Sequence, residues 1–367
     1  MRIGSLILAL IALPTIALAQ TARPQIETIP AQTRPGVAFQ IRVSGEWPNT
    51  CPPELLPVVI VDRTIDLAVR QSDQICGQAI TPFSVTFDPA AVAGARFPQS
   101  GVYRVRFSVK DEVNRPSLMG FRVIDVRAAG ARSVQPEAGF WMPDEAGEFA
   151  TSGSGVGFML ELQNNSLAVT TNAYAPGGPA TWYLSAGALS GFTFRGELLQ
   201  SVGGQPVWGE YRGPQWVAPV GALDIEFVSD SAAVAWYSRP SGEAASDPLE
   251  LMPVSMRRMN FAMLGEGQAL AGTWVYTAPA ARNEMAPALV QLSYRADRSS
   301  PGEAVLIDAQ RGFELRCGVD LARKDGPPTS CLLLANGAEH ARFDNNSLSR
   351  LSGNSAGESV VLVRVSN

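Results

Sequence analysis

The sequence predicts an all-β protein, and three observations support that prediction. Apolar residues alternate with polar ones in many short runs, which is the pattern of a half-buried strand. The 367 residues include 34 glycines and 27 prolines, which separate these runs as turns would. Segments with helical periodicity are few. A chain of this length is expected to form two or three domains.

Residues 1–19 have the features of a secretory signal peptide. Arg2 precedes an apolar run from Leu6 to Leu13, and Ala17-Leu18-Ala19 forms an Ala-x-Ala cleavage site before Gln20. The apolar run is shorter than the roughly 20 residues that cross a bilayer, and no later stretch is long enough. The sequence therefore predicts export to the periplasm or the extracellular space, without a membrane span.

The four cysteines form two pairs that are close in the sequence, Cys51 with Cys76 and Cys317 with Cys331. Local disulfides are the natural interpretation in an exported chain. No Cys-x-x-Cys spacing occurs and His340 is the only histidine, so the usual zinc ligand sets are missing. We expect two structural disulfides, no metal and no cofactor.

The charge distribution argues against nucleic acid as a partner. The formal net charge is -5, and Lys110 and Lys324 are the only lysines. Phosphate binding depends on clustered positive charge, and the sequence contains no basic run.

Residues 20–130 are predicted to form a β-sandwich. Several short alternating runs occur within about 100 residues, which is the size and rhythm of an immunoglobulin-like sandwich. The segment Gly101-Val102-Tyr103-Arg104-Val105 also resembles the entry to a late strand in bacterial immunoglobulin-like domains. The antibody-type Cys, Trp, Cys spacing is absent, so the resemblance is to the architecture. Trp47 is either a ligand platform on a loop or a strand-end residue that packs over the sandwich edge, and the second role is commoner for Trp.

Residues 133–260 are predicted to form an antiparallel meander. Phe158, Leu160 and Leu162 alternate with other residues, a polar turn follows, and a third strand carries Trp182. The stretches Gly-Phe-Trp-Met-Pro-Asp-Glu-Ala-Gly at 139–147 and Gly-Pro-Ala-Thr-Trp-Tyr at 178–183 also carry a resemblance. Residues 136–240 are similar to an uncharacterised β-rich module common in exported proteins of Gram-negative bacteria, which begins Gly-Leu-Trp-Trp-Asn-Pro-x-Glu-Ser-Gly. This resemblance implies a fold and a location, and it assigns no catalytic residue.

Three tryptophans of this segment, Trp141, Trp182 and Trp216, are candidate ligand-binding residues. Exposed rings on one face of a sheet stack on sugars or hold a peptide. The alternative is that the rings fill a barrel or sandwich interior. That alternative is favoured because the adjacent Trp-Tyr pairs send neighbouring rings to opposite faces of a strand.

Residues 261–367 are predicted to form a further sandwich or barrel segment, which either stands alone or shares a core with 133–260. Its Gly272-Thr273-Trp274 start also resembles that of lipocalin-type barrels, whose mouths hold apolar ligands. Residues 353–357 fit Gly-x-Ser-x-Gly, with His340 and Asp344 upstream. A nucleophile elbow needs a helix after the serine, but a strand is predicted there, so a polar turn is favoured.

Taken together, the sequence predicts an exported, non-enzymatic β-rich binding protein with an unknown protein or glycan partner. The first alternative is a carboxylate-dependent hydrolase acting on glycans, because two acids on neighbouring strands suffice for that chemistry and sequence spacing does not reveal them. The second alternative is a carrier of an apolar ligand that uses the C-terminal segment.

Overall fold

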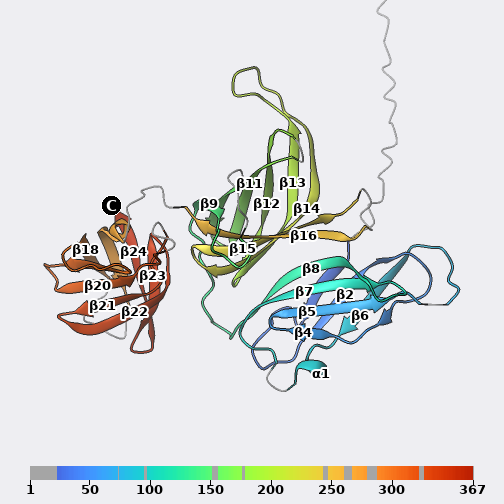
Figure 1. Cartoon of the computed structure of the whole chain (residues 1–367), viewed down its shortest axis with the longest axis horizontal. Coiled ribbons are helices and arrows are strands. Elements are labelled where there is room, and N and C mark those ends of the chain that lie inside the picture. The colour runs from blue at the N-terminus through green and yellow to red at the C-terminus, as the bar shows by residue number, and fades with distance from the viewer. Residues whose placement is uncertain are drawn as a thin grey trace, which may run out of the picture.

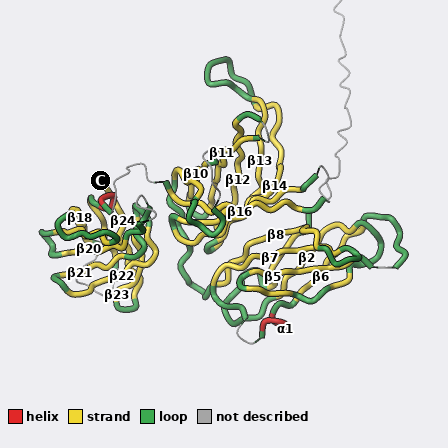
Figure 2. The backbone as a smooth tube through the Cα atoms, in the orientation of Figure 1, coloured by secondary structure: helices red, strands yellow, loops and turns green. Residues whose placement is uncertain are grey.

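The computed structural model describes residues 23–72, 74–94, 97–150, 156–175, 178–242, 247–259, 267–278, 287–321 and 326–366. The predicted signal peptide at 1–19 lies outside these residues. The described residues form 24 strands, one short α-helix and one 3-10 helix, η1 (Gln268–Leu270), which confirms the all-β prediction (Figures 1 and 2). None of the described helices is long and apolar enough to cross a membrane.

The N-terminal domain consists of two β-sheets that enclose one core. The first sheet contains β1 (Gln25–Ile29), β2 (Gln40–Trp47) and β6 (Thr81–Phe87). The second contains β3 (Glu54–Leu55), β4 (Val59–Val61), β5 (Thr64–Arg70), β7 (Gly101–Lys110) and β8 (Pro116–Val126), and helix α1 (Ala90–Ala93) precedes β7. Ile41 and Val43 of β2 alternate with exposed residues and pack against Val105 and Phe107 of β7 in one buried cluster. Alternating apolar residues on both sheets therefore form the predicted sandwich core.

The central residues form a closed antiparallel barrel of eight strands. The strands are β9 (Gly139–Pro143), β10 (Gly157–Gln163), β11 (Ser166–Tyr174), β12 (Ala180–Ser190), β13 (Thr193–Gly203), β14 (Pro214–Ser229), β15 (Ala232–Pro240) and β16 (Leu249–Arg258). Each strand pairs with the next, and β16 returns to pair with β9, so that Arg258 lies opposite Trp141. The predicted meander is thus closed into a barrel, which leaves no free sheet edge.

The last residues form a second closed antiparallel barrel. Its strands are β17 (Gly272–Thr277), β18 (Ala288–Tyr294), β19 (Glu303–Asp308), β20 (Phe313–Gly318), β21 (Cys331–Ala335), β22 (Ala338–Asn346), β23 (Arg350–Ser355) and β24 (Glu358–Ser366). Its interior is occupied by a cluster of buried side chains that includes Trp274, Leu315 and Phe343, each at 0% exposure. Each barrel therefore encloses its own buried cluster.

Strand β8 joins the N-terminal domain to the outer wall of the first barrel. Phe121 and Val123 of β8 lie in a buried cluster with Val234 and Trp236 of β15. Residues on the other face of β8, such as Ile124, pack into the N-terminal core. Both faces of this strand are therefore covered by apolar side chains. Figure 1 shows β8 on the side of the N-terminal domain that faces the first barrel.

Polar contacts near Asp230 hold the second barrel against the first. Asp230, in the β14–β15 turn, accepts hydrogen bonds from Arg132 Nη2 at 2.6 Å and from the backbone N–H of Gln135 at 2.8 Å. The carboxylate of Glu137 accepts a hydrogen bond at 2.8 Å from the N–H of Ser349, which precedes β23. The segment that links the N-terminal domain to the first barrel therefore also contacts the second barrel.

Candidate ligand-binding site

The structure places the three candidate tryptophans in different environments. Trp141 is 1% exposed and lies in the core of the first barrel, where its Nε1 donates a hydrogen bond to the carbonyl of Glu137 at 2.9 Å. Trp182 is 46% exposed and pairs with Asn172 on the wall of the barrel. The backbone of Trp216 pairs with Val202 in the β13–β14 hairpin, and its side chain is outside the described atoms. Trp141 and Trp182 therefore do not share one surface.

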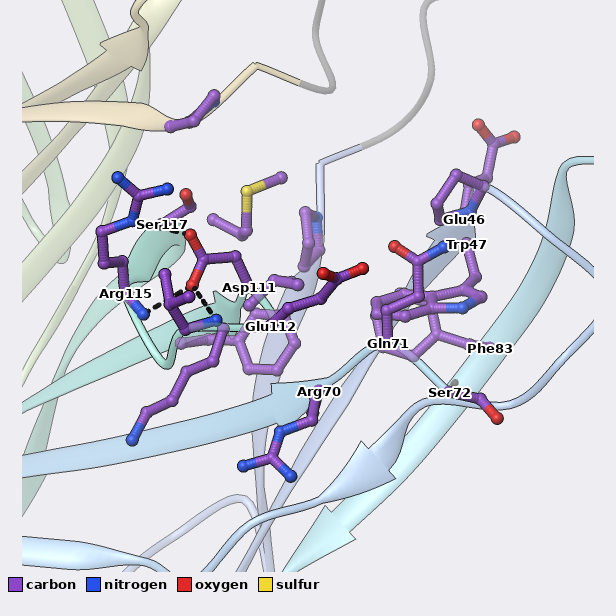
Figure 3. A pocket seen from close by; sticks show the side chains of 18 of the residues that line it. Glu46, Trp47, Arg70, Gln71, Ser72, Phe83, Asp111, Glu112, Arg115 and Ser117 are labelled. Atoms are coloured by element: carbon purple, nitrogen blue, oxygen red, sulfur yellow. Dashed lines mark hydrogen bonds and ion pairs between the residues drawn. The ribbon is translucent and has the colours of Figure 1, made fainter. Parts of the chain in front are cut away.

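A pocket at one end of the N-terminal domain offers a more complete site. It has a volume of about 980 Å³ and opens where β2, β5 and β7 end and β8 begins (Figure 3). Its apolar part includes Trp47, Phe83 and Phe107. The Trp47 and Phe83 rings meet edge to face at 5.6 Å, and Phe83 stacks on Phe107 at 6.3 Å. These rings make the floor of the pocket rigid and continuous with the domain core.

Charged side chains surround this apolar floor. Three of them are acidic and three are basic: Glu46, Asp111, Glu112, Arg70, Lys110 and Arg115. Figure 3 shows Trp47 and Phe83 on one side and Asp111, Glu112 and Arg115 on the other. Because the charges balance, the rim favours a ligand without strong net charge.

Asp111 is committed to the β7–β8 turn. Its carboxylate accepts hydrogen bonds from the backbone N–H of Arg115 at 2.7 Å, from the N–H of Val113 at 3.1 Å, and from Arg115 Nε at 2.8 Å. These bonds stabilise the ionised form, so the backbone N–H of Arg115 first of all holds the pKa of Asp111 below its usual range. Arg70 Nη2 also donates to the side chain of Asn114 in this turn at 2.7 Å. Asp111 therefore fixes the shape of the rim and is unsuited to act as a general acid.

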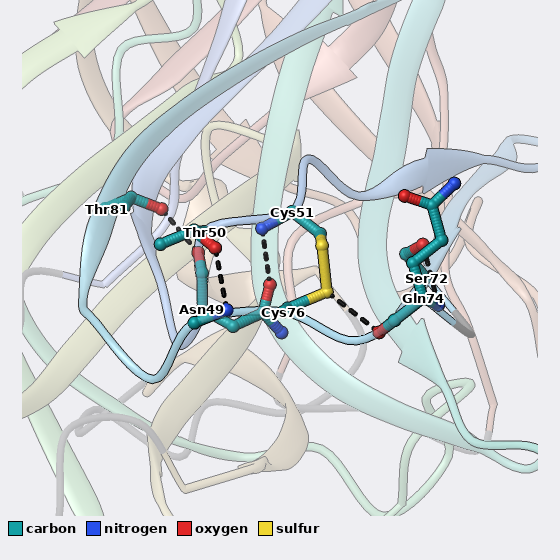
Figure 4. Close-up of a disulfide and its surroundings, with 8 residues drawn as sticks. Asn49, Thr50, Cys51, Ser72, Gln74, Cys76 and Thr81 are labelled. Carbon is teal, nitrogen blue, oxygen red and sulfur yellow. Dashed lines mark hydrogen bonds between the residues drawn. A yellow bond between two sulfur atoms is a disulfide. The ribbon is translucent and has the colours of Figure 1, made fainter.

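A disulfide holds the opposite wall of the pocket, which is formed by residues 71, 72 and 74–80. Cys51 and Cys76 are bonded, and the N–H of Gly77 donates to Thr50 Oγ1 at 2.9 Å while the N–H of Thr50 donates to the carbonyl of Gly77 at 3.0 Å (Figure 4). Gln71, Ser72, Gln74 and Ile80 of this segment line the pocket. The disulfide therefore positions side chains that line the pocket.

Three buried donors at this end of the domain have no hydrogen-bond partner among the described residues. They are Trp47 Nε1, Arg70 Nε and Asn49 Nδ2. Trp47 and Arg70 line the pocket, and Asn49 lines an adjoining cavity of about 540 Å³ that shares Gln71 and Ile80 with it. Buried donors are nearly always satisfied in folded proteins. Oxygen acceptors of water or of a ligand would complete this site.

The pocket also borders the first barrel. Pro248, which lies just before β16, lines it together with Pro24. Pro24 lines the cavity at the barrel as well. Ligand sites often form where two domains meet, and this placement is consistent with that tendency.

The carboxyl groups with raised pKa values lie elsewhere, at the domain contacts. Burial raises the pKa of Asp125, Asp224 and Asp230, although nearby arginines oppose the effect. Each accepts a hydrogen bond from an arginine and from a backbone N–H. None of these three acids lines the three cavities described in the structure. Their protonation is therefore relevant to domain contacts, not to chemistry in a pocket.

The Gly-x-Ser-x-Gly segment forms a hairpin turn. Ser355 ends β23, and its hydroxyl donates to the carbonyl of His340 at 2.6 Å. Ala356 and Gly357 adopt positive φ values of 47° and 86°, and strand β24 follows. The strand–turn–helix of a nucleophile elbow is absent from these described residues, as the sequence indicated.

The described residues contain no group of three or more His, Cys, Asp or Glu side chains that could hold a metal ion. Both predicted cysteine pairs lie at disulfide distance, and Cys317 stands directly opposite Cys331 on β20 and β21. Sequence reasoning missed most of the pocket, because it does not give the strand pairing that brings Arg70, at the end of β5, close to Asp111 in the β7–β8 turn. The only signal was Trp47 at the end of an alternating run.

Comparison with known proteins does not identify the chain. No family model matches it, and neither the curated proteins nor the solved structures give a significant match.

Proposed function

We propose that this protein is an exported, non-enzymatic binding protein that holds a neutral glycan in the pocket at the end of the N-terminal domain. The observation that carries the proposal is the balanced rim of charged side chains around an apolar floor. Sugar rings combine apolar C–H faces with hydroxyls that both donate and accept hydrogen bonds. The carboxylates of the rim accept from such hydroxyls, its arginines and lysine donate to them, and the apolar floor contacts the C–H faces. The unpartnered donors of Trp47, Arg70 and Asn49 add a need for oxygen acceptors.

The proposed location is supported by three features. Two disulfides are compatible with an oxidising compartment. The sequence of residues 1–19 and the similarity of residues 136–240 to a module of exported Gram-negative proteins favour export as well.

The test is binding of the chain from Gln20 onward to glycan, peptidoglycan and peptide arrays. Gln71→Trp fills the pocket, whereas Gln40→Trp places the same ring on an exposed position at the other end of the N-terminal domain. We expect the wild type and Gln40→Trp to bind the same neutral glycans, and Gln71→Trp to lose at least ten-fold in affinity. Equal binding by both variants, or binding to peptides alone, would overturn the glycan proposal.

A hydrolase is the second candidate, because Glu46 and Glu112 line the same pocket and Asp111 is committed to its turn. Glycan hydrolysis needs two carboxyl groups on either side of the scissile bond. Product release from a bound glycan that is lost in Glu46→Gln and Glu112→Gln would establish this activity. Under the binding proposal, the wild type leaves the glycan intact.

A further inference from the structure

The interior of the first barrel differs between its two ends. Near the β12–β13 and β14–β15 turns it is filled by Trp141, Phe194 and Phe227, all at 2% exposure or less. At the other end a cavity of about 1610 Å³ reaches the inner wall. Tyr183, Val220 and Tyr237 line this cavity and also pack against the buried cluster of the barrel. An eight-stranded barrel is wide enough to hold one small ligand, and the open end leaves that space. We call this end the barrel mouth.

A pair of hydroxyls lies on the inner wall below the barrel mouth. Tyr237 OH and Thr171 Oγ1 are 2.9 Å apart, and either is able to donate to the other. Two hydroxyls carry two hydrogens, and their mutual bond uses one of them. The described residues provide no other hydrogen bond to either hydroxyl. The second hydrogen is therefore available to an acceptor oxygen.

The environment of Tyr237 keeps this pair neutral. Its withdrawal from bulk water raises the pKa of Tyr237 well above that of a free tyrosine, although the bond to Thr171 opposes the shift. The phenol is thus protonated at neutral pH, and it acts as a hydrogen-bond donor or acceptor without charge.

The side chains around the hydroxyls are also uncharged. Leu198, Gln200 and Val220 line the cavity on β13 and β14, and Met252 lies directly opposite Tyr237 on β16. Among the charged lining residues, Arg239 and Glu250 form an ion pair at 2.7 Å. Arg195 and Glu197 also line the cavity, but they alternate along β13 with buried core residues and so face the outside of the barrel. Arg23 precedes β1 and belongs to the N-terminal domain. An inner wall of this kind favours a ligand that is largely apolar and has no net charge.

We propose that the barrel mouth binds a small, neutral, amphipathic molecule whose carbonyl or hydroxyl oxygen accepts a hydrogen bond from the Tyr237–Thr171 pair. This site differs from the glycan pocket, with which it shares Pro24, and apart from residues 23–25 its lining residues belong to the first barrel. The sequence placed an apolar ligand in the last segment, but the interior of that barrel is occupied by Trp274, Leu315 and Phe343. The open interior lies one barrel earlier in the chain.

The probe for the test is Nile red, a neutral dye with a carbonyl oxygen that becomes fluorescent in apolar surroundings. Val220→Trp fills the barrel mouth. Val217→Trp is its matched control, because Val217 lies on the same strand and is 54% exposed. We expect saturable binding to the wild type and to Val217→Trp, and loss of at least ten-fold in affinity for Val220→Trp. Equal affinities for the two variants, or no saturable binding to the folded wild type, would overturn the proposal.

Two further variants make the test specific. Tyr237→Phe keeps the ring and removes the hydroxyl, so it should weaken Nile red by about five-fold, the effect of one neutral hydrogen bond. Unchanged affinity would remove the hydroxyl pair from the proposal. If Val220→Trp does not fold, Gln200→Trp replaces it, since Gln200 lines the same cavity. Gln71→Trp should leave Nile red binding unchanged, and a loss there would assign the dye to the glycan pocket and contradict the barrel site.

Discussion

Arg195 and Asp224 form an ion pair that joins two strands of the first barrel to the N-terminal domain. Arg195 Nη1 donates to Asp224 Oδ2 at 2.8 Å and to the carbonyl of Phe121 in β8 at 2.8 Å. Asp224, at 0% exposure, also accepts from the N–H of Val123 at 3.4 Å. The pair therefore ties two residues of β8 to the barrel wall, and its protonation should affect the domain contact.

The first prediction concerns the pH dependence of stability at Asp224. Burial raises its pKa in the folded protein above the reference value of 3.8, so the folded state binds a proton more tightly than the unfolded state. The carboxyl group then contributes most to stability below about pH 4 and contributes less as the pH rises toward neutrality. The difference in melting temperature between wild type and Asp224→Asn should be more favourable to the wild type at pH 4 than at pH 7. A difference that grows with pH would show that Arg195 outweighs burial.

The second prediction concerns the two disulfides. Cys51 and Cys76 are partly exposed, and most residues of the segment 74–80 are exposed. Cys317 and Cys331 are 0% and 2% exposed inside the second barrel. Thiolate attack requires access to the sulfur, so mild reductant should open Cys51–Cys76 first. Timed alkylation followed by mass spectrometry measures the order, and simultaneous reduction would contradict it.

Each lost disulfide should lower the free energy of unfolding by about 3 kcal/mol while the β signal in circular dichroism persists.

The third prediction compares Trp141 with Trp182, which the sequence analysis proposed together as candidate ligand-binding residues. Trp141→Ala removes a core ring that meets Phe227 at 6.3 Å, and it should destabilise the protein by about 3–5 kcal/mol. Trp182→Ala removes a half-exposed ring and should cost about 1 kcal/mol or less. Urea unfolding measures both, and similar losses would contradict the assigned burial. Loss of glycan binding in a folded Trp182→Ala variant would restore this ring as a binding residue.

The fourth prediction concerns the contact between the barrels. Asp230→Ala removes the acceptor that holds the backbone N–H of Gln135, whose side chain accepts a hydrogen bond from Arg350 of the second barrel, so the second barrel should move more freely. Small-angle X-ray scattering should then give a larger radius of gyration than that of the wild type. Asp297→Ala is the control, because it removes only an exposed pair with Arg295 in the second barrel. Equal radii for the two variants would show that the contact does not depend on Asp230.

The local structure followed from the sequence because the apolar alternation is strong. Phe158 and Leu160 were expected on one face of a strand, and they are 0% and 1% exposed. Apolar alternation does not predict that a barrel closes. In the first barrel, β9 and β16 pair across more than 100 residues, and no local sequence pattern encodes that contact. Strand β1 was missed, since Ile26 is its only fully buried residue. The similarity of the N-terminal domain to immunoglobulin-like domains, and of residues 136–240 to an exported module, stays a prediction.

The candidate sites were less accessible to sequence analysis than the strands were. The pocket combines Trp47 of β2 with Arg70 of β5 and Asp111 of the β7–β8 turn. Arg70 and Asp111 lie together because β5 pairs in parallel with β7, and Trp47 reaches them because the two sheets pack on one core. The hydroxyl pair of the barrel mouth likewise joins β11 and β15, which are not neighbours in the sheet order. A single sequence gives the faces of strands, but it does not give which strands meet across an interior.

The two-sided packing of β8 sets the size of the smallest fragment that should fold by itself. A chain that ends near residue 130 would expose Phe121 and Val123 to water. The carbonyl of Phe121 would also lose the hydrogen bond that it accepts from Arg195. Such a fragment should self-associate through that apolar strip. A chain truncated after residue 259 keeps the apolar side chains that pack on both faces of β8, and it lacks the second barrel. The N-terminal domain and the first barrel should therefore fold as one unit, although each has its own core.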